Sequence, residues 1–172
     1  MKQETKQKVQ NSILDFSLPP YEQIPDVGLY LDQVTKYING YLQPLGDYAL
    51  TASMISNYVK KGLLDSPVKK QYDREQVAYL FFIAVAKTVL SLDALTGFIE
   101  VQKRSYPLQT AYEYFRRQMV SMLRQHFELP EESYTGEAEN TDEKRLFCSC
   151  ISAVTQKIYL EKCLSAIAEE SQ

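Results

Sequence analysis

The chain has 172 residues, a formal net charge of −3 and 45% hydrophobic residues. This composition excludes global disorder, and the length suits one compact domain or a small domain with a helical extension. No apolar run approaches the roughly 18 residues that a membrane span needs. The polar N-terminus also lacks the apolar core of a secretory signal, so we expect a cytoplasmic protein that makes no membrane contact.

The three cysteines do not predict a metal site. Cys148 and Cys150 lie two residues apart in an expected helix, so their side chains point about 200° apart. Cys163 lies further along, and His126 is the single histidine. Because structural zinc normally takes four Cys or His ligands, we expect no metal and no cofactor, and we interpret the cysteines as small core residues.

Catalysis is also not expected. The sequence has no nucleophile elbow, no glycine-rich phosphate loop and no paired carboxylates at a known spacing. His126 lies near an expected helix end, where the helix dipole favours a cation, and that structural role is favoured over general-base chemistry. We therefore do not expect an enzyme.

The N-terminal part predicts one supporting helix. Residues 1–17 are weakly patterned, and we expect them to be frayed. Residues 18–45 form a supporting segment and helix, in which prolines first impose an extended chain and Asp26 then caps the helix. Its apolar positions recur every three or four residues, at Val27, Tyr30, Leu31, Val34, Ile38, Tyr41, Leu42 and Leu45.

Local capping signals divide the central part into helices. Thr51 is the expected N-cap of a short helix, and Gly62 is placed where a left-handed residue ends it. Asp73 and Gln76 have the spacing of a capping box at the start of a nearly all-apolar helix. Ser91 is the expected cap of another short helix.

Residues 102–172 predict a helical C-terminal region. One helix begins at Pro107 and runs to about Phe127, and a final helix spans about 142–168. Between them, residues 128–143 carry seven acidic residues and no basic one, which predicts an acidic loop.

The apolar stripe of the final helix has two interpretations. Its members are Phe147, Ile151, Val154, Ile158 and Leu164. The stripe is longer than one small domain needs, which favours a homodimer through the C-terminal helices. The same residues could instead close an intramolecular bundle with the Pro107 helix.

One face of the helix after Thr51 is suited to DNA. Ser53, Ser56, Asn57 and Lys60 share this face, and hydroxyls, an amide and a lysine can contact base edges and phosphates in a major groove. The alternative is an ordinary solvated face. Such faces usually carry more Glu and Lys, because Ser and Asn are poorer helix formers.

A basic cluster follows that helix. Five basic residues stand against two acidic ones between Lys60 and Arg74, and lysines in such a loop neutralise phosphates. The alternative is a solubilising loop. The full predicted DNA-binding set is Ser53, Ser56, Asn57, Tyr58, Lys60, Lys61, Lys69, Lys70 and Arg74.

Several stretches resemble the MerR pattern. They are ISNYVKKGLL, the junction YDREQV at 72–77, and AYLFFIAVAKTVLSLDALTGFIE. In that family a helix ending in Tyr-x-x-x-Gly-Leu leads to a wing, a Tyr before a helix cap and a Leu-Ser-Leu start of the next helix. LPPYEQIPDVGLYLDQVTKYINGYL followed by LTASMISNYVKKGLL looks still closer to an uncharacterised bacterial domain-of-unknown-function family of MerR-like regulators, over roughly residues 18–125.

The resemblance implies an all-α protein with a MerR-like winged helix-turn-helix at 46–101. It implies a dimeric, DNA-binding transcriptional regulator. The alternative is a helical protein-interaction or small-ligand-sensing module that kept the fold without DNA binding. An aromatic cluster could line a pocket for a small-molecule effector, although such residues are more often core. Its members are Tyr106, Tyr112, Tyr114 and Phe115.

Overall fold

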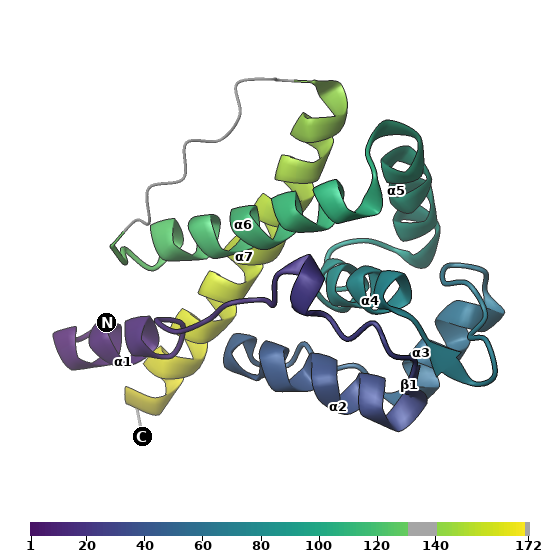
Figure 1. Cartoon of the computed structure of the whole chain (residues 1–172). Coiled ribbons are helices and arrows are strands. Elements are labelled where there is room, and N and C mark those ends of the chain that lie inside the picture. The colour runs from purple at the N-terminus through teal and green to yellow at the C-terminus, as the bar shows by residue number, and fades with distance from the viewer. Residues whose placement is uncertain (131–140, 171–172) are drawn as a thin grey trace.

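The computed structural model describes residues 1–130 and 141–170 and is mainly helical (Figure 1). Its helices are α1 (Gln3–Asn11), α2 (Leu31–Leu42), α3 (Ala52–Lys60), α4 (Arg74–Ala86), α5 (Leu92–Ser105), α6 (Leu108–His126) and α7 (Asp142–Glu170). Two strands, β1 (Leu29–Tyr30) and β2 (Gln71–Tyr72), form a small antiparallel sheet. The expectation of an all-α fold is confirmed at this level. None of the helices described is long and apolar enough to cross a membrane.

Near the N-terminus, where the sequence analysis expected residues 1–17 to be frayed, Gln3–Asn11 form helix α1. Helix α1 packs beside the C-terminal end of α7, so the two ends of the described chain lie close together in Figure 1. Its apolar side contributes Val9 to the core, and Ile13 and Phe16 follow it there. The Lys8 ammonium lies 2.5 Å from the Glu169 carboxylate. Because these partners lie far away in the sequence, a local pattern cannot reveal them.

Helix α2 begins later than the sequence predicts. Asp26 does not cap it; the helix begins at Leu31, and the Gln33 side chain accepts a hydrogen bond from the Tyr30 amide at 2.9 Å. The preceding residues instead form β1, which pairs with β2. Strand pairing with a segment some 40 residues away therefore replaces the expected local cap.

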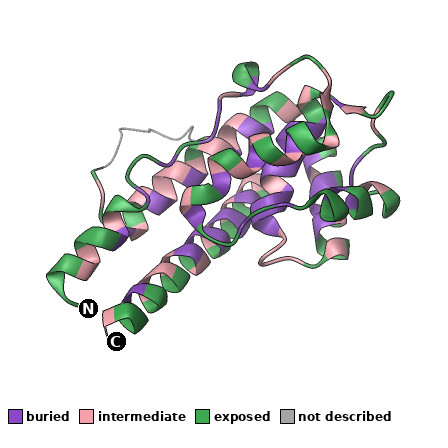
Figure 2. Cartoon of the chain, turned by 90° about the horizontal axis from the view of Figure 1, so that it is seen from below, coloured by how far each residue is buried: buried purple, intermediate pink, exposed green. Residues whose placement is uncertain are grey.

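Helix α4 forms the centre of the molecule. The Asp73–Gln76 capping box is confirmed, because the Asp73 carboxylate accepts from the Gln76 amide and the Gln76 side chain accepts from the Asp73 amide, each at 2.9 Å. After this start, nine of the thirteen residues of α4 are buried. Figure 2 shows burial concentrated in the central helices, while the outer turns are exposed. The expectation that this helix is buried almost all round is confirmed.

Helices α6 and α7 pack against each other, and Figure 1 shows that they cross at an angle. Phe147, Ile151, Val154 and Ile158 all point into the core that these helices share with α4. The stripe expected to form a homodimer thus closes an intramolecular bundle, and of its five members only Leu164 is exposed. Most of the expected acidic loop at 128–143 lies outside the described residues.

Candidate nucleic-acid interface

Helix α3 presents one polar face outward. Ser53, Ser56, Asn57 and Lys60 are all exposed, while Ile55 is buried against the core. The Thr51 hydroxyl caps the helix by accepting a hydrogen bond from the Met54 amide at 3.1 Å, as expected. The helix therefore separates a core side from a face that is free of charge until its last turn.

The C-terminal end of α3 is a tight stop. Gly62 has a φ of +74°, which confirms the expected left-handed residue. Its amide donates to the Val59 carbonyl at 3.0 Å, and the Leu63 amide donates to the Tyr58 carbonyl at 2.9 Å. This pair of bonds is a Schellman motif, and it brings Leu63 back into the core.

The start of α3 is fixed by a residue that the sequence analysis missed. Asn39 of α2 donates its side-chain amide to the Leu50 carbonyl at 2.8 Å and accepts from the Leu50 amide at 2.8 Å. Leu50 directly precedes the Thr51 cap, so these bonds tie α2 to the beginning of α3. Asparagine is a poor helix former, and its place inside an amphipathic helix is the signal that could have revealed it.

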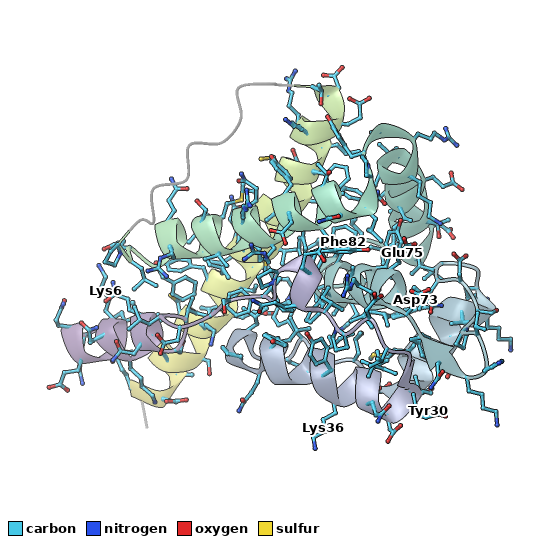
Figure 3. All side chains as sticks on the ribbon, viewed as in Figure 1. Lys6, Tyr30, Lys36, Asp73, Glu75 and Phe82 are labelled. Carbon is cyan, nitrogen blue, oxygen red and sulfur yellow. The ribbon has the colours of Figure 1, made fainter. Side chains whose placement is uncertain are left out.

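A two-residue hairpin follows α3. The Val68 amide donates to the Gln71 carbonyl at 3.1 Å, and the Gln71 amide donates to the Val68 carbonyl at 2.9 Å. Gln71 and Tyr72 then pair with β1 as strand β2, and Tyr72 is buried. Figure 3 labels Tyr30, which pairs with Gln71, at the outer edge of this small sheet. Lys69 and Lys70 lie at the tip of this hairpin.

Both residues at the hairpin tip have an unusual backbone. Lys69 has a φ of 51° and Lys70 a φ of 64°. Two-residue hairpins favour positive φ at both central positions, and sequences such as Asn-Gly fulfil this at little cost. For other L-residues the left-handed region costs on the order of 1 kcal/mol each. The tip therefore carries two lysines where the backbone favours other residues.

The four lysines around α3 and the hairpin form no ion pair with the described residues. Lys60, Lys61, Lys69 and Lys70 are exposed, and none forms a salt bridge with another residue of 1–130 or 141–170. By contrast, Lys6 and Lys8 of α1 are paired with glutamates. Four members of the predicted basic cluster are therefore exposed and without an ion pair in the described part of the chain.

Two residues of the predicted DNA-binding set, Tyr58 and Arg74, are not available to DNA in the structure. Tyr58 is buried, because it lies one turn after Ile55 on the core side of α3. Arg74 donates from Nε to the Ile24 carbonyl at 2.9 Å, and its guanidinium lies 3.3 Å from the Glu22 carboxylate and 3.8 Å from that of Asp26. Arg74 thus holds the N-terminal segment to α4 and is not available to phosphates.

The aromatic cluster expected to line an effector pocket belongs mainly to the core. Tyr112 and Phe115 are buried, and burial raises the pKa of the Tyr112 hydroxyl. They border an apolar cavity of about 30 Å³, which has room for no more than about one water molecule. Known small-molecule sites are about 300–1,000 Å³, so this cavity does not suit such a ligand.

A second hollow lies between the 63–68 loop and helices α4 and α5. It measures about 190 Å³ and is lined by polar groups that include Asp65, Glu75 and Lys103. The Lys103 ammonium lies over the Tyr79 ring, 5.6 Å from its centroid. Within the described residues, no three His, Cys, Asp or Glu side chains are grouped so that they could hold a metal ion.

The sequence matches the family described as "Domain of unknown function (DUF1836)" over residues 19–115. The matched range includes α2, α3, the hairpin, α4 and α5. Its two ends touch, because the Tyr112 hydroxyl donates to the Pro19 carbonyl at 2.9 Å. Helices α1 and α7 lie outside it. No curated protein and no solved structure matches the chain.

Proposed function

The chain belongs to the DUF1836 family, and we propose that it is a cytoplasmic, DNA-binding transcriptional regulator with a MerR-like winged helix-turn-helix at 46–101. In this proposal α3 is the recognition helix and the Lys69–Lys70 hairpin is the wing. The alternative is a protein-interaction or ligand-sensing module without DNA affinity. Of the ligand-sensing version, the small apolar cavity beside Tyr112 and Phe115 argues only against that cavity as the ligand site.

The hairpin tip carries the proposal. Two lysines occupy positions where Asn-Gly would have lower backbone energy, and neither has an ion-pair partner among the described residues. Costly backbone conformations tend to occur at functional sites, where the side chains are needed. A need for positive charge at this tip explains the choice of lysine, and DNA phosphates are the partner that such a tip suits.

The polar face of α3 supports the same conclusion. Hydroxyl and amide groups of Ser53, Ser56 and Asn57 face outward without an ionisable neighbour until Lys60. Such groups suit base edges, and lysines in the last turn suit phosphates. Residues 43–51 connect the supporting helix α2 to α3, and the Asn39–Leu50 bonds fix the end of this connection directly before α3.

We also propose a homodimer, now through the outward side of α7. Leu146, Ala153 and Leu160 are exposed at every seventh position, and Leu164 is exposed one turn after Leu160. A repeat of seven is typical of helices that pair along their length. Two copies would provide two recognition helices, which a usefully specific site normally needs.

The experiment is binding-site selection with the full chain, followed by salt titration of the selected duplex. Changing Lys60, Lys69 and Lys70 to Ala is expected to weaken binding to any duplex. It is also expected to flatten the slope of log K against log salt by up to about 0.9 for each phosphate that is no longer neutralised. As a control, changing Lys2 and Lys8 near the N-terminus to Ala also removes positive charge and is expected to leave the slope unchanged. A parent protein that binds no duplex would exclude the proposal.

A further inference from the structure

We propose that Asn57 is the residue of α3 that reads a base, and that this base is adenine. The inference rests on the DNA-binding function proposed above and names the specificity of that site. It follows from the chemistry of the exposed face of α3 and from a comparison of two asparagines in this chain.

Most of the exposed face of α3 lacks the charged side chains that read guanine and cytosine. From Ala52 to Val59, α3 contains no Arg, Lys, Asp or Glu. Guanine is read mainly by Arg or Lys, and cytosine by Asp or Glu, whereas adenine is read by the amide of Asn or Gln. Lys60 and Lys61 lie at the C-terminal end of the helix beside the basic hairpin, and we assign them to phosphates, which position the helix without reading a base. The chemistry of the face therefore favours adenine.

Asn57 is the one amide side chain on this face. It is exposed, and its side chain forms no hydrogen bond with any residue of 1–130 or 141–170. Its backbone carbonyl is already used, because it accepts from the Lys61 amide at 2.9 Å. The side chain thus offers a donor and an acceptor to a partner outside the protein.

Asn39 is an example in this chain of a side-chain amide that bonds an adjacent donor and acceptor at the same time. It makes both bonds to Leu50 at once, each at 2.8 Å. The major-groove edge of adenine presents the same pair, with the N6 amino group as donor and N7 as acceptor. Asn57 can therefore form with adenine the two-bond contact that Asn39 forms inside the fold.

The neighbours of Asn57 fit an adenine–thymine pair. Ser53 and Ser56 are small, so the helix can approach the base edges closely. Met54 lies one turn before Asn57, and 37% of its surface is exposed although it is apolar. Apolar side chains contact the methyl group of thymine, which lies on the partner of adenine in the same groove.

The test compares the parent with Asn57→Ala on three versions of the selected duplex. These carry adenine, guanine or 7-deazaadenine at the contacted position; 7-deazaadenine lacks the N7 acceptor. We expect the parent to prefer adenine over guanine by about 5- to 150-fold, and to lose much of its affinity for 7-deazaadenine. Asn57→Ala is expected to bind all three alike. Lys60→Ala serves as a control that weakens all three by a similar factor.

The outcomes separate this inference from the proposed function. If the parent binds a duplex but Asn57→Ala keeps its preference for adenine, the inference is wrong and the DNA-binding function stands. If the parent binds DNA and is indifferent to 7-deazaadenine at every position, the inference is also wrong. A parent that binds no duplex overturns both. The Asn57 side chain is exposed and unbonded within the described residues, and alanine is the better helix former, so an equal or slightly higher melting temperature is expected for Asn57→Ala.

Discussion

The side chain of Asn39 holds the backbone of Leu50 from both sides, with an N–H···O bond in each direction at 2.8 Å. Leu50 is buried and lies near the end of the long connection between α2 and α3. Without Asn39, both polar groups of Leu50 would lack their partner. These two bonds therefore set where α3 begins and how it is oriented on α2.

Replacing Asn39 with Ala is expected to reduce the free energy of unfolding by about 1–3 kcal/mol, because a buried donor and acceptor lose their partners. Urea unfolding at neutral pH measures the change. Asn57→Ala is the matched control, since it removes the same amide from an exposed position, and it is expected to shift the midpoint little. Equal midpoints for the two variants would show that the Asn39 bonds do not stabilise the connection.

Gly62→Val is expected to destabilise the protein by on the order of 1 kcal/mol or more, because β-branched residues resist positive φ. The φ of +74° at Gly62 sets this requirement. Gly97→Ala in α5 is the opposing control. A Cβ at Gly97 meets no atom within 4 Å, so this change is expected to stabilise by about 0.5–1 kcal/mol. If both variants shifted the melting temperature in the same direction, the requirement for positive φ at Gly62 would be contradicted.

The features that the sequence predicted correctly are local. The caps at Thr51, Asp73 and Ser91 and the left-handed Gly62 each depend on hydrogen bonds between residues within five positions. Such bonds have fixed spacings, so residue types at those spacings reveal them. The all-apolar character of α4 likewise predicted its central place.

The features that the sequence analysis missed depend on distant partners. Arg74 is a neighbour of the lysines in the chain, but its carboxylate partners lie about 50 residues earlier. Tyr58 is different, because its spacing from Ile55 is a local signal that already places it on the core side of α3. The stripe of α7 has two possible partners on the sequence alone, because periodicity does not distinguish α6 from a second copy.

The single histidine predicts a pH dependence of stability. Burial lowers the pKa of His126 from its usual 6.5, and Nε2 has no hydrogen-bond partner among the described residues. The unfolded chain therefore binds a proton more readily than the folded protein. The contribution of neutral His126 to the free energy of unfolding is fully present above about pH 6.5, and it is lost as the pH falls from there through the lowered folded pKa.

Urea midpoints at pH 7.5 and 5.5 measure this effect. The parent is expected to lose stability between the two values, and His126→Phe, which keeps an aromatic ring without the titrating group, is expected to lose less. A parent whose loss equals that of His126→Phe would show that His126 does not contribute. Above about pH 5, ordinary carboxyl groups remain largely ionised and contribute little to the difference.

The outward side of α7 predicts the oligomeric state. Leu160 and Leu164 are 57% and 64% exposed. Light scattering at micromolar concentration is expected to give a dimer mass for the parent and a monomer mass for Leu160→Glu/Leu164→Glu. Changing the buried residue Ile158 instead would unfold the bundle and cannot serve as a test. A monomer mass for the parent would exclude the proposed homodimer.

The most direct test of DNA binding is the double change Lys69→Asn/Lys70→Gly at the hairpin tip. Because Asn-Gly suits positive φ at both positions, we expect this variant to unfold at a higher urea concentration than the parent. We expect the same variant to bind the selected duplex more weakly and with a flatter salt slope, since it no longer neutralises two phosphates. A gain in stability with a loss of DNA affinity would show that the lysines are kept for binding. Unchanged affinity and an unchanged slope would contradict the proposed wing and, with it, the proposed function.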